Sequence, residues 1–396
     1  MTQYDVIVIG GGAAGMISSI FSGRQGKKTL LCEKMPKIGK KLLVTGAGRC
    51  NLLNEKVDPS FYDPDAQELV RSVFEKFGKE KILTFFREIG LEVYAEPDGR
   101  IFPVTNQAAS VMKVLEMELA KQKVSVETGF AVKTVRFSSG IFEVLAENKK
   151  RVEGKAVILC VGGKSYPSLG ADGGGYGIAE RFSHTVIEPV PCTVPLLVKD
   201  PWCHHLQGQK IRASAAAWIQ GRKIREAAGE VLFAQYGLSG TAILDISNPI
   251  SIAMNREKIH DVSVELDLIP FMSEAGLEKE LARRVSRGIS AENLLEGLLP
   301  AKLCLAMKDL LKKGNMTVVA LELKHKRFKV NGTRSWNEAE FTAGGVPTEE
   351  VESGTLESKF QKHFYLAGEI INIGGLRGGY NLAWAWASGA LAGQSA

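Results

Sequence analysis

The stretch 4–33, YDVIVIGGGAAGMISSIFSGRQGKKTLLCE, decides the fold of this 396-residue chain. Residues 4–9 form a short apolar run rich in β-branched side chains, which predicts a buried parallel strand. Gly10, Gly12 and Gly15 follow in the pattern G-x-G-x-x-G, and the small apolar residues after them are typical of a helix packed against a sheet. This order of strand, glycine turn and helix predicts a Rossmann-type nucleotide-binding unit.

Each part of this stretch has a role in binding a dinucleotide. Gly10 permits the tight turn, Gly12 lets the backbone approach a pyrophosphate, and Gly15 lets the helix pack closely on the strand. The helix N-terminus offers free N–H groups to the phosphates. Residues 28–33 predict a second strand that ends in Glu33, whose carboxylate accepts hydrogen bonds from ribose hydroxyls. An acid at this place favours FAD or NAD over NADP, and these residues do not separate FAD from NAD.

The composition is that of an ordinary globular protein, with 45% hydrophobic and 24% charged residues. The net charge of +6 is spread along the chain, whereas a dense basic stripe with interleaved aromatic residues would favour nucleic-acid binding. The six cysteines are dispersed without C-x-x-C spacing, so they predict reduced thiols in the cytoplasm. We expect no secretory signal and no membrane span.

The rest of the chain alternates between helical and strand patterns. Residues 65–90 and 107–122 predict helices, 124–152 a β-meander and 155–161 a buried strand before a glycine-rich loop. From about residue 190 the pattern changes to the apolar–polar alternation of an antiparallel β domain, which continues to 270.

The later part of the chain returns to the first domain. Residues 272–314 predict helices and 316–334 strands. The glycine-rich region that follows leads into an apolar terminal helix, which we expect to direct its N-terminus into the nucleotide site that begins at Gly10.

Seven stretches carry a resemblance to a known family: VIGGGAAGM at 8–16, GAGRCN at 46–51, GRIFPVT at 99–105, GGKSYPSLGADGGGYGIA at 162–179, GLSG at 237–240, TAGGV at 342–346 and AGEIINIGGLRGGYNLAWAWASG at 367–389. In this order they resemble the FAD-dependent oxidoreductases described as aminoacetone oxidase-like or BaiN-like flavoproteins. The resemblance implies an α/β fold with FAD as the cofactor. It implies a Rossmann-like FAD-binding domain from both chain ends (1–189 and 335–396), an inserted β-barrel domain (190–270 and 315–334) and a small helical domain (271–314).

The resemblance also suggests which residues bind FAD. We assign the phosphates to Gly10, Gly12, Ala14 and Gly15, and the adenosine ribose to Glu33. We assign the pyrophosphate–ribityl region to Arg49 and Glu369. The flavin ring should lie near Asn51, Gly379, Tyr380 and Asn381. The remaining expected cofactor-binding residues are Ala13, Lys34, Gly46, Cys50, Val132, Gly162, Gly163, Gly368 and Leu382.

The loop after Glu369 departs from the family pattern. Asn372 and Gly374 stand where acidic residues are usual, and Arg377 replaces a small polar residue. These changes would make this end of the pocket more positive, which raises the possibility of an anionic substrate.

No residue is assigned as a catalytic acid or base, although Tyr166 or Tyr380 could donate a proton to a substrate. We expect Cys50 and His184 to have packing roles. No metal site is expected, because adjacent residues of a strand, as we predict for Cys203-His204-His205, point to opposite faces.

Three functions remain open. The first is reduction of a conjugated C=C bond in a small organic substrate, with NAD(P)H as a transient electron donor. The second is oxidation of an aminoacetone-type amine by oxygen. The third is a flavin-bearing module that binds nucleic acid or protein, which only the mild basic charge supports. The substrate and the oligomeric state are not determined by the sequence.

Overall fold

The computed structural model describes residues 3–396 and divides the chain into two compact units. Unit 1 comprises Met1–Pro189 and Phe341–Ala396, so it is built from both ends of the chain. Unit 2 comprises Val190–Glu340. The further division of the middle segment into a barrel domain and a helical domain stays a prediction.

Unit 1 is organised around a seven-stranded sheet with the order β6-β2-β1-β9-β8-β7, in which β19 also pairs with β9. Strands β6, β2, β1, β9 and β19 are mutually parallel, whereas β7, β8 and the start of β9 form an antiparallel meander. The strands are β1 (Gln3–Ile9), β2 (Thr29–Glu33), β6 (Ser125–Thr128), β7 (Val132–Ser138), β8 (Ile141–Ala146), β9 (Arg151–Leu159) and β19 (Phe364–Leu366).

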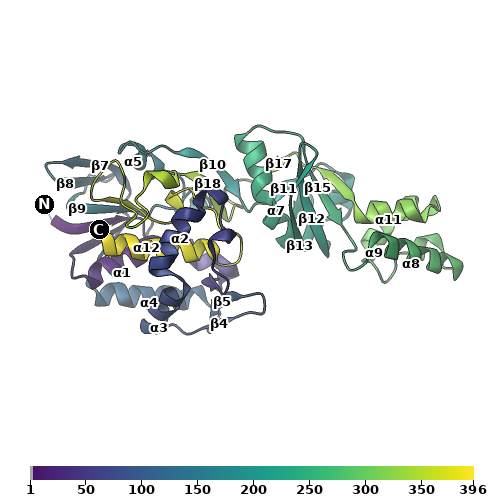
Figure 1. Cartoon of the computed structure of the whole chain (residues 1–396), viewed down its shortest axis with the longest axis horizontal. Coiled ribbons are helices and arrows are strands. Elements are labelled where there is room, and N and C mark those ends of the chain that lie inside the picture. The colour runs from purple at the N-terminus through teal and green to yellow at the C-terminus, as the bar shows by residue number, and fades with distance from the viewer. Residues whose placement is uncertain (1–2) are drawn as a thin grey trace. The chain divides into compact units, whose positions relative to one another are not determined.

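Two helices from opposite ends of the chain pack against each other beside this sheet (Figure 1). They are α1 (Ala13–Arg24) and the terminal helix α12 (Tyr380–Ser395). Their contact is close because α12 presents glycine to α1: a Cβ on Gly389 would lie 2.5 Å from the Ala14 carbonyl oxygen. Ser18 of α1 donates a hydrogen bond to the Gly389 carbonyl at 3.0 Å, which fixes the crossing. The expected Rossmann-type unit and its closure by the C-terminal helix are therefore confirmed.

The other helices of unit 1 follow the sequence pattern with one interruption. The segment 65–90 forms two helices, α2 (Gln67–Phe77) and α3 (Lys79–Glu88), because Gly78 between them adopts extended backbone. Helix α4 (Ala108–Lys121) matches its prediction, and α5 (Tyr176–Glu180) is short. A small sheet joins β3 (Leu53–Asn54), β5 (Arg100–Pro103) and β4 (Val93–Ala95), and β10 (Ile187–Cys192) pairs with β18 (Phe341–Gly345).

Unit 2 contains a second seven-stranded sheet with the order β16-β15-β12-β13-β14-β11-β17. Its strands are β11 (Leu196–Leu197), β12 (Lys210–Ile219), β13 (Arg222–Ala234), β14 (Gly237–Ser239), β15 (Val262–Asp267), β16 (Lys326–Lys329) and β17 (Gly332–Thr333), and neighbouring strands run antiparallel. Its helices include α8 (Glu274–Ser286), α9 (Ala301–Ala306) and α10 (Lys308–Lys312). The antiparallel β character and the helices after residue 272 are confirmed.

Three segments of unit 2 are helical where the sequence predicted strands. Helix α7 (Thr241–Ser251) lies inside the alternating region, and α11 (Met316–Lys324) occupies the start of 316–334. The side chain of Asn315 caps α11 by accepting the Val318 N–H at 3.2 Å, which outweighs the local preference of its β-branched residues for a strand. Helix α6 (Pro201–His205) contains the Cys-His-His run, so our expectation that it forms a strand was wrong.

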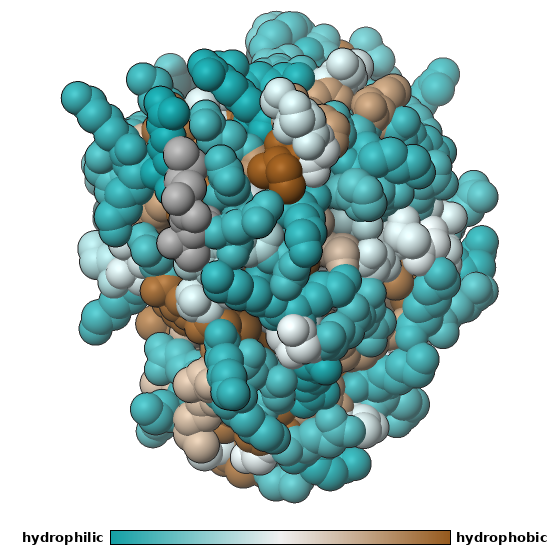
Figure 2. Space-filling view, turned by 90° about the vertical axis from the view of Figure 1, so that its left-hand side faces the viewer, coloured by the Kyte–Doolittle hydropathy of each residue, from teal (hydrophilic) through white to brown (hydrophobic). Residues whose placement is uncertain are grey.

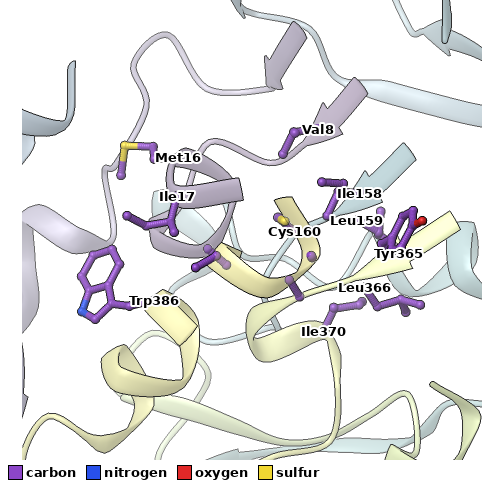
Figure 3. Packing of buried hydrophobic residues seen from close by; sticks show 14 of the residues in the cluster. Val8, Met16, Ile17, Ile158, Leu159, Cys160, Tyr365, Leu366, Ile370 and Trp386 are labelled. Carbon is purple, nitrogen blue, oxygen red and sulfur yellow. The ribbon is translucent and has the colours of Figure 1, made fainter. Parts of the chain in front are cut away.

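Each unit encloses its own apolar core. Figure 3 shows buried side chains of unit 1 that come from β1, α1, the end of β9 and the residue after it, β19, the 3-10 turn Gly368–Ile370 and α12: Val8, Met16, Ile17, Ile158, Leu159, Cys160, Tyr365, Leu366, Ile370 and Trp386. The face drawn in Figure 2 is mainly hydrophilic, with small apolar groups between the polar ones. Of the helices in residues 3–396, none is long and apolar enough to cross a membrane.

Candidate functional site

The glycine turn between β1 and α1 is shaped partly by packing and partly by open space. A Cβ on Gly10 would lie 2.4 Å from the Cys160 carbonyl oxygen, and one on Gly15 only 1.8 Å from the Gly10 carbonyl oxygen. Both glycines are therefore required for the helix to sit against the strands. Gly12 differs, because a Cβ there would meet no atom within 4 Å. Gly12 is the N-cap of α1 and supplies no side-chain cap, so the N–H groups of the first turn are left for a ligand to bind.

The end of β2 lies beside this turn. Glu33 accepts a hydrogen bond from the Gly11 N–H at 2.7 Å with one carboxylate oxygen and from the Met35 N–H at 2.7 Å with the other. The Phe130 N–H binds the Glu33 carbonyl at 2.9 Å, which brings the start of β7 at Val132 toward the same strand end. The glycine turn and the acid therefore lie together, and the segment just before Val132 is bound to the same strand end; their role in binding the cofactor stays a prediction.

Five other residues predicted to bind the cofactor differ in their burial and contacts. Ala13 and Ala14 form the first turn of α1, and Ala14 is buried. Lys34 is paired with Asp172 at 2.6 Å. Gly162 follows β9, and Leu382 in α12 packs against the core of unit 1.

The loop 46–51 packs on β5 through Arg49 and is bound to the N-terminus of α12 through Asn51. Arg49 pairs with Glu96 at 2.8 Å, and its guanidinium carbon lies 4.0 Å from the centre of the Phe102 ring. Cys50 is fully buried, and burial raises the pKa of its thiol to about 12. A buried thiol with a raised pKa suits the packing role that we expect for Cys50.

Asn51 joins this loop to the N-terminus of α12. In the amide orientation that satisfies both groups, Asn51 accepts the Gly379 N–H at 3.0 Å and donates to the Leu53 carbonyl at 3.1 Å. Gly379 has φ of +102°, and a Cβ there would lie 2.5 Å from the Leu53 carbonyl oxygen. Glycine is thus needed at Gly379 both for its backbone conformation and for the close approach of β3. Gly46 precedes Asn51 in this loop, where a Cβ would lie 2.7 Å from the Asn51 nitrogen.

Aromatic residues surround the first turn of α12. The Tyr380 ring stacks on Phe61 with centroids 4.8 Å apart, and the Tyr62 hydroxyl donates to the Tyr380 carbonyl at 2.7 Å. Asn381 exchanges two hydrogen bonds with the Gly375 backbone, at 2.9 and 3.0 Å. The four residues predicted to lie near the flavin ring are therefore contiguous in space.

A polar cluster that the sequence did not indicate surrounds Glu369. Lys41 pairs with this carboxylate at 2.8 Å and donates to the Ser165 hydroxyl, which itself donates to Glu369 at 3.1 Å. The Thr342 N–H binds the same carboxylate at 2.8 Å. A Cβ on Gly163 would lie 2.4 Å from the Thr342 hydroxyl oxygen, so Gly163 allows this approach. The only sequence signal was the position of Lys41 at the start of a glycine-rich loop.

The strand end before Glu369 is held to α12. The Gly368 N–H donates to the Ser388 hydroxyl at 3.0 Å, and the Trp384 indole N–H donates to the Gly368 carbonyl at 3.1 Å. A Cβ on Gly368 would lie 2.9 Å from the Ala14 Cβ, which places Glu369 next to the first turn of α1.

Tyr176 brings a buried polar atom without a partner to this cluster. Its side chain is buried and its hydroxyl has no hydrogen bond to residues 3–396. Burial raises its pKa above the usual range, and the charge of Glu369 adds to the shift. A buried hydroxyl of this kind normally has a partner, and a cofactor hydroxyl or phosphate oxygen would supply one.

A neighbouring segment brings a carboxylate to the loop after Glu369. Asp63 accepts a hydrogen bond from the Gly374 N–H at 3.1 Å, so a carboxylate from another segment lies at this position. Asn372 accepts the Gly344 N–H at 2.8 Å and has a role in holding the backbone. The effect of Asn372, Gly374 and Arg377 on the charge of the pocket stays a prediction.

The arrangement fits a dinucleotide cofactor. It combines an open helix N-terminus at Gly12, an acid at Glu33 bound to the glycine turn, and a polar cluster with the Tyr176 hydroxyl, which has no partner within residues 3–396. In sequence comparisons, the family model described as the HI0933-like protein Rossmann domain matches residues 4–395. The chain belongs to the HI0933-like family.

Several relatives of this HI0933-like protein match over nearly its whole length. The 3-dehydro-bile acid delta(4,6)-reductase of Clostridium scindens is 35% identical, with 98% of each chain covered. The ribosomal RNA dihydrouridine synthase of Escherichia coli is 30% identical, with 98% of this chain and 96% of that protein covered. Both names denote enzymes, and the family membership identifies the protein as a flavin-dependent oxidoreductase.

Solved structures support the fold of the HI0933-like protein. A 3-ketosteroid-delta4-(5alpha)-dehydrogenase from Rhodococcus jostii RHA1 superposes with a TM-score of 0.51 at 15% identity, covering 100% of this chain and 96% of that one. A flavocytochrome c3 fumarate reductase has a TM-score of 0.50 at 14% identity, covering 99% and 78% of the two chains. At these identities the likeness concerns the fold alone.

Proposed function

We propose that this protein uses FAD to reduce a carbon–carbon double bond conjugated with a carbonyl group, with NAD(P)H as the electron donor. The observation that carries this proposal is the full-length match to a bile acid delta(4,6)-reductase. The reaction in the name of the second relative supports the same chemistry, since dihydrouridine is uridine with a reduced ring C=C bond next to a carbonyl.

The residues of unit 1 suggest how FAD would be held. The N–H groups at the start of α1, left accessible by Gly12, would bind the pyrophosphate, and Glu33 would bind the adenosine ribose. Glu369 would accept a hydrogen bond from the ribityl chain. When bound, FAD carries a hydride from a nicotinamide to the electron-poor carbon of the conjugated substrate.

The protein's own contribution is orientation and electrostatics. The N-terminus of α12, held by the link from Asn51 to Gly379, presents its positive dipole end to the flavin region and would stabilise negative charge there. The Tyr380 phenol lies in the first turn of this helix and would be one candidate proton donor to the substrate, although burial raises its pKa and so makes it a weaker acid. Tyr166 remains the other candidate proton donor.

A second candidate function is reduction of uridine in ribosomal RNA. Two relatives at 30% identity, from Escherichia coli and Haemophilus influenzae, bear the name ribosomal RNA dihydrouridine synthase. Their match covers 98% of this chain, so the same site would serve a nucleobase. No relative named in these comparisons favours the amine oxidase alternative.

The test is a substrate panel with one readout for each function. Purified protein with FAD and NAD(P)H would be given a steroid 4,6-dien-3-one, ribosomal RNA lacking dihydrouridine, or aminoacetone with oxygen, and products would be identified by mass spectrometry. We expect the steroid to gain two hydrogens in an NAD(P)H-dependent manner. If only the RNA is reduced, the reaction is the proposed one but the substrate is a nucleobase of RNA. If only the amine is oxidised, the proposal is refuted.

A further inference from the structure

The cluster around Glu369 contains a charged contact whose purpose the fold alone does not explain. The Lys41 and Glu369 side chains are 26% and 23% exposed, so each is about three-quarters buried at an ion pair of 2.8 Å. The second oxygen of the carboxylate accepts from the Thr342 N–H at 2.8 Å and from the Ser165 hydroxyl at 3.1 Å. The carboxylate is therefore held in one orientation by three donors.

The place of this carboxylate creates an electrostatic problem for an anionic ligand. Glu369 follows Gly368, which packs against Ala14 in the first turn of α1. This is the helix terminus expected to bind a pyrophosphate. A fixed carboxylate next to a doubly charged pyrophosphate repels it, and the repulsion is strong in a partly buried site. A cation beside the carboxylate removes that penalty.

Arg49, which we assigned with Glu369 to the pyrophosphate–ribityl region, pairs with another carboxylate. Arg49 pairs with Glu96, a carboxylate that also binds Arg100 at 2.9 Å, and stacks on Phe102. Its charge is thus neutralised within the segment around β4 and β5. Lys41, by contrast, contacts the Glu369 carboxylate directly.

We infer that Lys41 is a positioning residue of the flavin site, which holds and neutralises Glu369 so that this carboxylate can bind the ribityl chain beside the pyrophosphate. The inference rests on the proposed use of FAD. Without the ammonium group, Glu369 would keep only neutral donors, and its uncompensated charge would oppose the cofactor's phosphates.

The experiment measures FAD affinity directly on protein from which flavin has been removed. The dissociation constant would be determined by flavin fluorescence for the wild type, K41M, E369Q and the double variant. The matched control is K40M, because Lys40 is the neighbouring lysine and makes no ion pair within residues 3–396. Urea unfolding of each apoprotein shows whether a variant is folded.

We expect K41M to raise the dissociation constant at least tenfold, which corresponds to about 1.4 kcal/mol, while K40M stays within threefold of the wild type. In the E369Q background, K41M should add less than a further threefold, because the lysine acts through the carboxylate. A purely structural role would lower the unfolding free energy without this non-additivity.

The possible results distinguish a wrong role for Lys41 from a wrong proposal that the protein uses FAD. If the wild type binds FAD and K41M binds it equally well, or if the two substitutions are fully additive, the inference is wrong while the proposed function stands. If K41M does not fold, E369Q is compared with the double variant, and a double variant that binds FAD at least tenfold more weakly than E369Q overturns the inference, because the lysine would then act without the carboxylate. A wild type that binds no FAD overturns the proposed function itself.

Discussion

Replacing two glycines of the same turn should separate the fold from the cofactor site. Gly15→Ala places a Cβ 1.8 Å from the Gly10 carbonyl oxygen, a distance that the backbone must relieve by moving. Gly12→Ala places a Cβ in space with no atom within 4 Å, at a residue whose φ of −79° suits alanine. The two substitutions add the same methyl group, so their chemistry is matched.

The first substitution should change the unfolding free energy and the second the affinity for FAD. Overpacking at Gly15 costs about 1–3 kcal/mol or more, partly offset by the roughly 1 kcal/mol that alanine gains in a helix. At the N-cap, Gly12→Ala should change the unfolding free energy of the apoprotein by less than about 1 kcal/mol. With FAD, the new methyl group would push the pyrophosphate off the helix N-terminus. The loss of one or two charge-assisted hydrogen bonds, about 3 kcal/mol, weakens binding about a hundredfold.

Urea unfolding of the apoproteins and flavin fluorescence titrations give both quantities. We expect Gly15→Ala to lower the unfolding midpoint and Gly12→Ala to retain it while losing FAD. If Gly12→Ala binds FAD within threefold of the wild type, the space in front of α1 is not the pyrophosphate site and the reasoning fails.

Three further outcomes follow from the packing and the buried groups. Gly389→Val should cost about 3 kcal/mol of unfolding free energy, because even its Cβ would lie 2.5 Å from the Ala14 carbonyl oxygen; an unchanged urea midpoint would contradict the close helix crossing. Burial lowers the pKa of His184, whose Nδ1 lies 2.9 Å from Glu350. The unfolded chain therefore takes up this proton first as the pH falls below about 6.5, and the protein loses stability there. His184→Gln should flatten the dependence of unfolding free energy on pH in this window, and an unaltered slope would exclude His184 as its source. All six cysteines are buried, and burial raises the pKa of Cys50 to about 12, so a thiol reagent should label the native protein only as fast as it unfolds; rapid labelling of one thiol would disprove this.

The sequence predicted those parts of the fold in which local pattern and packing agree. The strand, glycine turn and helix at residues 4–33 each have a distinctive local signature, so β1, α1 and β2 appear where expected. Helix α11 was missed because its β-branched residues favour a strand locally. The cap at Asn315 and the burial of the helix within unit 2 stabilise the helical conformation instead. Only the tertiary structure contains that second kind of information.

The candidate site shows the same limit. Asn51 and Gly379 were expected to lie together because the family resemblance placed both near the flavin ring, and they share a hydrogen bond. The pair of Lys41 and Glu369 joins residues far apart in the chain without a motif that links them. The contact of Arg49 with Glu96 was equally invisible, since it depends on how the loop packs on β5.

The most direct test of the central claim is an anaerobic absorbance measurement on the purified protein. We expect a bound-flavin band that NADH or NADPH bleaches without oxygen, and that returns when a carbonyl-conjugated substrate such as a steroid 4,6-dien-3-one is added. A band that persists with both nicotinamides and bleaches with an amine, or a colourless protein that takes up no FAD, would contradict the account.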